Sequence, residues 1–310
     1  MEFDLNSNSY PYDPVAHSHC LSSLKEYGDY YQITVSKMIN DVELVKLTER
    51  QKYFIEQGLS RSEAVWLDWC LSKNLLDLFG SDYQYYIEKP DHVGRYLSNI
   101  LRARKTLDEL GNCNEWDYFV TLTVDPGKYD RFDLKSFYKA FSSFKRHLGF
   151  RFSYVFVPEQ HKDGAWHLHG LISGLPIEQL SEYRLSDYWP YTEVKLPNYI
   201  RERVAKGEKL YNWSPYSDRF GYSLFEPLRD KGKASSYITK YIGKGFVGNE
   251  QFKNTRLLIP SLGLKRAVKV KKGFTSIDDV KPSFDCDFAT TFKFDKSKYS
   301  LEDVLKYFYN

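Results

Sequence analysis

The segment from Trp116 to Ile172 constrains the fold most, because its hydrophobic pattern changes period along its length. Residues 116–124 and 152–158 are aromatic and β-branched, residues 134–148 repeat apolar side chains at helical spacing, and residues 166–172 are again strand-like. These patterns predict strand, helix, strand and strand, in that order. The sequence His161-Lys-Asp-Gly164 predicts a turn that joins the last two strands into a hairpin. This order favours an antiparallel sheet with helices on one side.

The rest of the chain suggests three ranges. Residues 1–40 are polar and tyrosine-rich without a clear period, so we expect a loose arm, and the helical spacing of residues 41–110 makes 1–110 an N-terminal helical region. A domain is expected over 111–275, with an irregular, proline-containing insertion at about 175–230 and strands within 256–272. Residues 276–310 are expected to be a C-terminal tail that ends in a short amphipathic segment.

Charge and composition limit the classes of function. The formal net charge is only +3, so any nucleic-acid contact requires local basic patches, such as the one predicted at Lys265, Arg266 and Lys269. Aromatic residues make up 17% of the chain, and their rings suit stacking on single-stranded bases, although most are expected in the core. We expect a cytoplasmic protein with reduced thiols, because the four cysteines form no Cys-x-x-Cys pair and neither a signal peptide nor a membrane span is recognisable.

Two histidines in the last predicted strand are candidate metal ligands. Side chains alternate along a strand, so His167 and His169 point to one face while Leu168 points to the other. Glu159 ends the preceding strand and can reach the same face across the hairpin. Two imidazoles and a carboxylate suit Mn²⁺ or Mg²⁺ with positions left open for substrate oxygens. His161, in the turn, is the alternative third ligand but is less well directed.

A second constellation follows about seventy residues later. Tyr237, Lys240, Tyr241 and Lys244 stand at i, i+3, i+4 and i+7, which places them along one face of a helix. Tyrosines at this spacing commonly pack in a core, but interleaved lysines make a poor core stripe. A phenol with its ordinary pKa near ~10 is a weak nucleophile. A metal that polarises a phosphate, and an ammonium that stabilises developing charge, would supply the help it needs.

Together these motifs resemble those of the HUH endonucleases, and most of all the rolling-circle replication initiators (Rep proteins) of small single-stranded DNA phages and related plasmids. Phe119-Val-Thr-Leu-Thr123 resembles the family's first, strand-forming motif. His167-Leu-His169 matches its metal-binding motif, and Tyr237-Ile-Thr-Lys240 matches its nucleophile motif, with Tyr241 as a second tyrosine. The resemblance covers roughly residues 114–246. It implies an α+β fold, in which a central, mostly antiparallel sheet of about five strands carries the histidines between flanking helices.

The resemblance also implies an activity, a metal-dependent nickase and strand transferase. Tyr237 or Tyr241 would attack an origin phosphodiester, which gives a 5′-phosphotyrosine and a free 3′-OH that primes synthesis. Lys240 would orient the tyrosine or neutralise phosphate charge, and Glu159 stands where some relatives carry an acidic metal ligand. Lys244 and the patch from Lys265 to Lys269 are predicted to contact DNA.

The expected partners are single-stranded origin DNA, a separate helicase and a DNA polymerase. No nucleotide cofactor is expected, because Asp230-Lys-Gly-Lys-Ala-Ser235 lacks the first glycine of a phosphate-binding loop. Two alternatives stay open. A relaxase or transposase would use the same chemistry, and a non-catalytic binder of single-stranded nucleic acid would use only the aromatic and basic residues.

Overall fold

The structure is a computed structural model that describes residues 21–36, 47–59, 64, 68, 90–161, 163–192, 195–229, 238, 242, 256–285 and 289–309, with only the backbone for 90–98 and 100–101. The chain divides into two compact units. Unit 1 consists of residues 1–47 and 265–310, and unit 2 consists of residues 48–264. This division differs from the three ranges expected from the sequence, because the two ends of the chain come together in one unit.

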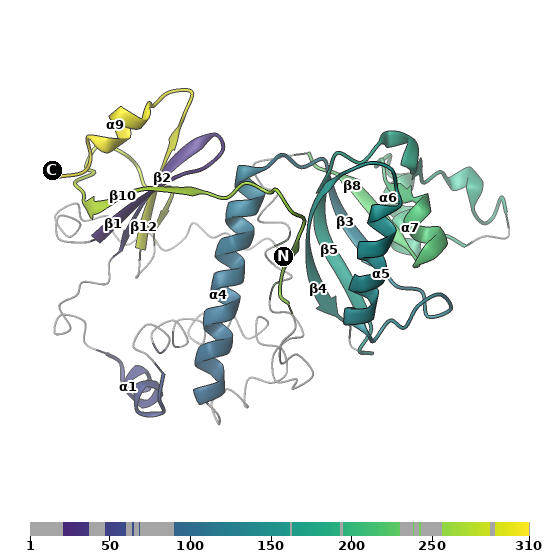
Figure 1. The fold of residues 1–310 in the computed structure, drawn as a ribbon, viewed down its shortest axis with the longest axis horizontal. Helices are drawn as coiled ribbons and strands as arrows, with labels where there is room; N and C mark the ends of the chain where they lie inside the picture. The colour runs from purple at the N-terminus through teal and green to yellow at the C-terminus, as the bar shows by residue number, and fades with distance from the viewer. Residues whose placement is uncertain are drawn as a thin grey trace. The chain divides into compact units, whose positions relative to one another are not determined.

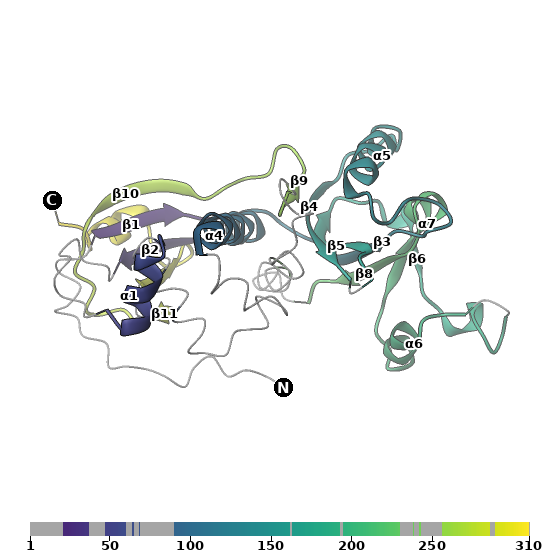
Figure 2. The same cartoon turned by 90° about the horizontal axis from the view of Figure 1, so that it is seen from below.

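Unit 2 contains a seven-stranded sheet in the order β6-β7-β8-β3-β5-β4-β9, in which every pairing is antiparallel (Figures 1 and 2). An α+β fold with antiparallel sheets is thereby confirmed. The strand, helix, strand and strand predicted between Trp116 and Ile172 are β3 (Tyr118–Thr123), α5 (Leu134–Arg146), β4 (Ser153–Gln160) and β5 (Trp166–Ser173). The sheet exceeds five strands because β6 (Leu180–Glu182), β7 (Tyr211–Trp213) and β9 (Ile259–Pro260) add short segments at its edges.

One face of this sheet packs on α5 through an aromatic core. Phe137, Phe141 and Phe144 repeat at helical spacing along α5 and are buried against Phe156 and Trp166 of the sheet. Gly170 of β5 permits this packing, because a Cβ atom there would lie 2.3 Å from the Cδ1 atom of Phe156 and 2.7 Å from a backbone oxygen. The period of 3.6 in α5 and of 2 in β5 therefore produce one shared interface.

The opposite face carries His167 and His169. Towards one end this face is apolar, with Phe119, Val155 and Leu171 buried against Leu107 and Leu110 of α4 (Pro90–Cys113). The same core includes Ile238 and Ile242, which are 0% and 1% exposed. Towards the other end the face becomes polar, and the histidines lie there. Unit 2 also contains α1 (Glu49–Glu56).

The proline-containing insertion is more ordered than expected. It contains α6 (Asn198–Ala205), α7 (Ser214–Arg219), two short 3₁₀ turns (Ile177–Gln179 and Leu185–Asp187) and β8 (Ser223–Pro227), which pairs with β3 in the centre of the sheet. The expectation of an irregular segment was therefore wrong for 223–227. Gly221 lets the chain enter β8, because at φ +149° an added Cβ atom would lie 2.4 Å from the carbonyl oxygen of Thr123.

Unit 1 is a five-stranded antiparallel sheet in the order β10-β1-β2-β12-β11. Its strands are β1 (Leu21–Glu26), β2 (Tyr30–Ser36), β10 (Val268–Phe274), β11 (Phe284–Asp285) and β12 (Ala289–Asp295). The short helix α9 (Leu301–Leu305) lies within the predicted amphipathic segment, and Val304 packs with Leu24, Ile33 and Phe292 in the core.

Residues 21–36 correct the expectation of a loose arm over 1–40. Tyr31-Gln-Ile-Thr-Val35 alternates apolar and polar side chains, and the apolar ones face the core. The partners of these strands, β10 and β12, lie more than 230 residues away in the sequence. Among the helices of the described residues, none is long and apolar enough to cross a membrane.

Candidate functional site

The register of three strands brings the candidate ligands into two adjacent rows. In one row Thr123 of β3 lies opposite His167 of β5, which lies opposite Glu159 of β4. In the next row Thr121 lies opposite His169. The prediction that both histidines share a face with Glu159 is therefore confirmed by strand pairing alone, before any side-chain contact is considered.

Each histidine is held by a threonine of β3. The Oγ1 atom of Thr123 lies 3.0 Å from Nδ1 of His167, and the Oγ1 atom of Thr121 lies 3.2 Å from Nδ1 of His169. A hydroxyl can donate to or accept from an imidazole nitrogen, so either tautomer is compatible with these contacts. Both bonds fix the ring orientation and direct the Nε2 atoms away from β3.

His169 and Glu159 converge at short distance. The Nε2 atom of His169 lies 2.6 Å from Oε2 of Glu159, and because a carboxylate only accepts, the hydrogen is on Nε2. His169 is only 7% exposed, and its ring stacks on Phe119 with 6.1 Å between centroids. This pair is thus the most enclosed polar contact on the histidine-bearing face.

His161 lies beside His167 rather than beside His169. The two rings stack with 3.6 Å between centroids and 25° between planes. Burial lowers the pKa of His167 from its ordinary 6.5 to about 4, and the proximity of His161 and His169 lowers it as well. The imidazole of His167 is therefore neutral at pH 7, the form in which a histidine can bind a metal.

The turn between β4 and β5 has the predicted chemistry. Gly164 has φ +86°, a left-handed conformation that favours glycine. The Oδ1 atom of Asp163 accepts a hydrogen bond from the amide of Ala165 at 3.0 Å, and its other oxygen lies 3.2 Å from Arg131. Asp163 thus acts within the turn, as expected from the sequence.

The donor set fits a hard divalent cation in chemistry, although the side chains are not gathered around one point. Within the described part of the chain, no group of three or more His, Cys, Asp or Glu side chains is arranged to hold a metal ion. Two donors bound to one cation at about 2.1 Å and at right angles lie about 3.0 Å apart. His169 and Glu159, at 2.6 Å, are close to that separation, whereas His167 would have to turn from His161.

The tyrosine segment is described only at two positions. Ile238 is helical and Ile242 lies in a turn, and both are buried on the histidine-bearing face. Tyr237, Lys240, Tyr241 and Lys244, the predicted nucleophiles and their basic neighbours, lie outside the described residues. Lys265, Arg266 and Lys269, the other predicted DNA contacts, belong to unit 1 and are exposed.

Comparison with known protein families points to DNA replication. Residues 117–246 match the family model of the replication-associated protein ORF2. The matched segment begins at β3, contains both histidines and Glu159, and extends past Tyr241. It supports the resemblance to rolling-circle replication initiators that the sequence motifs indicate. No curated protein and no solved structure matches the chain.

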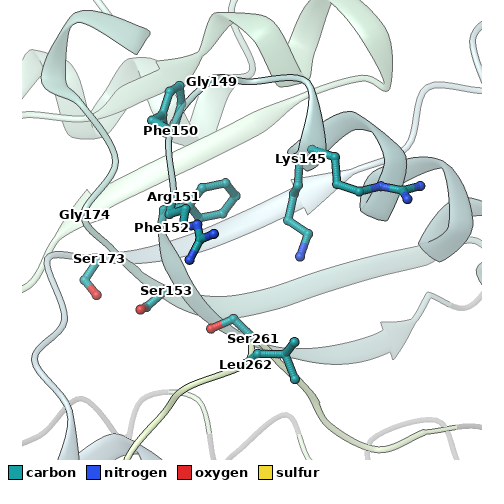
Figure 3. Close-up of a pocket in the computed structure, with 11 residues that line it drawn as sticks. Lys145, Gly149, Phe150, Arg151, Phe152, Ser153, Ser173, Gly174, Ser261 and Leu262 are labelled. Carbon is teal, nitrogen blue, oxygen red and sulfur yellow. The ribbon is translucent and has the colours of Figure 1, made fainter.

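A separate cavity lies at the other end of β4 and β5. It has a volume of about 830 Å³, and Lys145, Arg151 and the serines 153, 173 and 261 surround it (Figure 3). Ser153 pairs with Ser173, six residues along β4 and β5 from the row of Glu159 and His167. Lys145 is in the last turn of α5, where a cation offsets the helix dipole, and it donates to the Tyr154 hydroxyl. The cavity is therefore distinct from the histidine site.

Thr121 and Thr123 belong to the predicted strand motif, but the sequence pattern assigned them no role. Their signal was present, since two threonines at i and i+2 on a strand must share a face, as the two histidines do. What the sequence could not supply was the register that aligns one pair with the other.

Proposed function

We propose that this protein is a replication initiator that nicks single-stranded origin DNA through a tyrosine and later rejoins the strands. The family match supports a replication-associated role. The specific chemistry is inferred from the site. A neutral His167, an enclosed pair of His169 and Glu159, and a tyrosine segment anchored on the same face are together the parts that such a reaction requires.

The burial of Ile238 and Ile242 carries this proposal. Both side chains pack in one core with Phe119, Val157 and Leu171, and Val157 and Leu171 flank the row of His169. Tyr237 and Tyr241 directly precede the two isoleucines in the sequence. Consecutive Cα atoms are about 3.8 Å apart, so chain connectivity keeps both tyrosines close to the core beside the histidines.

The reaction is a transesterification without net hydrolysis. The phenolic oxygen of Tyr237 or Tyr241 forms a bond to the scissile phosphorus and loses its proton to solvent or a base. The bond from phosphorus to the 3′-oxygen breaks, and the leaving 3′-oxygen takes up a proton. The products are a 5′-phosphotyrosine and a free 3′-OH, and attack of a 3′-OH on the phosphotyrosine reverses these steps.

The ligand set would hold Mn²⁺ or Mg²⁺ through His167, His169 and Glu159. When bound, the cation would withdraw electron density from the scissile phosphate. Thr121 and Thr123 hold the two rings so that the Nε2 atoms face away from β3. Lys240 would supply a positive charge close to the nucleophile. Two tyrosines one helical turn apart could alternate without release of the DNA.

The test is a cleavage assay with two labels. The protein is incubated with Mn²⁺ and single-stranded oligonucleotides that tile the replication origin of its genetic element, each labelled at its 5′ or its 3′ end. The attack leaves the downstream fragment on the protein, so the 3′ label should migrate with the protein on a denaturing gel. The 5′ label should appear in a shorter fragment that a DNA polymerase can extend.

Omission of Mn²⁺ in the presence of a chelator is the matched control and should remove the adduct. Absence of an adduct from every oligonucleotide of the tiled set would contradict the proposal. Binding without cleavage would favour the non-catalytic alternative.

The threonine contacts give a further prediction. Replacement of Thr123 by Val preserves the shape of the side chain but removes the hydroxyl that orients His167. Loss of a group that orients a metal ligand typically costs about 10–100-fold in metal affinity. We expect Thr123→Val to weaken Mn²⁺ binding by such a factor, measured from the free Mn²⁺ signal in electron paramagnetic resonance. Thr123→Ser retains the hydroxyl and should bind Mn²⁺ like the unaltered protein, whereas equal losses would rule out this role.

A further inference from the structure

The sheet of unit 1 has one covered and one open face. Leu24, Ile33, Val35 and Phe292 point to the covered face, where Val304 from α9 packs on them. By alternation, the intervening residues of each strand point to the other face. Two contacts support this, since Gln32 donates to the Thr34 hydroxyl at 3.2 Å and the Lys293 ammonium lies 4.6 Å from the centre of the Tyr30 ring.

Lysines form a row across four strands of the open face. Lys269 of β10 lies opposite Lys25 of β1, which lies opposite Gln32 of β2, and Gln32 lies opposite Lys293 of β12. Neighbouring strands are about 4.8 Å apart, so the row extends for about 14 Å. Lys269 and Lys293 are exposed. We call the open face with this row the lysine face.

The adjacent row adds hydroxyl groups and ends in an aromatic ring. Its members, from β10 to β11, are Lys272, Ser23, Thr34, Thr291 and Phe284. Phe284 is 58% exposed, and Phe274, on the same face of β10, is 50% exposed. Asp295, at the end of β12, is an acidic residue of this face, and it accepts a hydrogen bond from the amide of Ser297.

Protection of the sheet edge does not account for this pattern. Lysines on β10 can prevent edge-to-edge association, but β1 and β12 are not edge strands. Lys25 and Lys269 also lie directly opposite each other, an arrangement of like charges that destabilises a sheet. Lys271 of the same basic run faces the core side, over the ring of Phe308, so the run is sorted by face. The retained repulsion suggests an anionic ligand.

We propose that the lysine face binds single-stranded DNA, with phosphates on Lys269, Lys272 and Lys293 and bases stacked on Phe274 and Phe284. Rows of ammonium groups match a phosphate backbone, and exposed rings accept unpaired bases of any sequence. The choice of DNA as ligand rests on the proposed replication function. The inference goes beyond it, because it gives unit 1 a binding role that is separate from cleavage.

The test measures binding without cleavage. The full-length protein, in a chelating buffer, is titrated into a fluorescent oligo-dT at several salt concentrations, and affinity is read from fluorescence anisotropy. The variant carries Lys269→Gln, Lys272→Gln and Lys293→Gln. The control carries Lys281→Gln, Lys298→Gln and Lys306→Gln, which remove the same charge from exposed lysines outside the strands.

Loss of three phosphate contacts should reduce the slope of log affinity against log salt by about 2, and affinity at 0.1 M salt by about 100-fold. The control triple should change affinity by less than about 3-fold. Phe284→Ala should weaken binding without a change in slope, whereas Tyr309→Ala, at a ring 53% exposed near the C-terminus, should not. Unchanged binding in the lysine variant, equal losses in both triples, or preferential loss of duplex binding would overturn the proposal.

The two proposals can fail separately. If no adduct forms with origin DNA but the lysine variant loses oligo-dT binding, the lysine face is supported and the nickase is not. If adducts form and the two triples bind alike, the reverse holds. Melting temperatures of both triples, which should match the unaltered protein, show that the folded state is unchanged.

Discussion

The double variant Tyr237→Phe/Tyr241→Phe should form no covalent adduct with origin DNA, a loss of at least about 1000-fold. The nucleophilic oxygen is the only atom removed, and the chemistry retains no alternative attacking group without it. Phenylalanine keeps the ring and its packing, so Ile238 and Ile242 should remain buried in their core. The adduct is measured with the 3′-labelled oligonucleotide on a denaturing gel.

The single variants separate the roles of the two tyrosines. One of them should lose the first cut, and the other should still cut but fail to release a rejoined product. Lys240→Gln serves as a control that retains both phenols and should reduce the rate without abolishing the adduct. An adduct of unchanged yield in the double variant would show that another residue is the nucleophile and would sink the assignment of this segment.

The site was predictable from the sequence as far as it rests on local periodicity. His167 and His169 share a face because a strand has a period of two, and the hairpin turn at Gly164 places Glu159 beside them. The structure adds the partners of the rings, Thr121 and Thr123, because their alignment depends on the register of β3 against β5, which no local pattern states. The role of His161 stayed open for the same reason, since the direction of a turn side chain is not periodic.

The fold was less predictable wherever partners lie far apart in sequence. The alternation of Tyr31-Gln-Ile-Thr-Val35 is strand-like, but five such residues next to a polar, tyrosine-rich stretch indicate little without a partner. Its neighbours β10 and β12 come from the other end of the chain. β8 was missed because Pro227 ends it and a proline-containing segment precedes it. In both cases the pairing, and not the propensity, decides the structure.

The aromatic content has mostly a structural explanation, with a remainder at the surface. Phe137, Phe141, Phe156, Trp213 and Phe220 belong to one cluster with tilted and edge-to-face contacts, the geometry that aromatic rings favour. This cluster makes the face of the sheet opposite the histidines rigid. Precise placement of a metal ligand requires such a support, since small displacements of a reacting group are costly in rate.

Removal of His169 is expected to have the second large effect. His169 is 7% exposed and contacts Glu159 at 2.6 Å, so His169→Ala removes one metal donor and leaves an enclosed carboxylate without its partner. We expect Mn²⁺ affinity to fall by at least about 100-fold and the DNA adduct to become undetectable. Affinity is measured without DNA from the free Mn²⁺ signal, which keeps the result independent of cleavage. Unchanged affinity would remove His169 from the ligand set.

Two further variants decide between the rival third ligands. Glu159→Gln keeps the shape of the side chain but removes its charge, and it should reduce Mn²⁺ affinity by about 10-fold or more if the carboxylate binds the cation. His161→Ala removes an exposed ring that stacks on His167 and should change affinity by less than about 3-fold. The opposite pattern, a loss with His161→Ala and none with Glu159→Gln, would assign the third position to His161. The contact of Glu159 with His169 favours the first outcome, because the two donor atoms already converge on the enclosed part of the face.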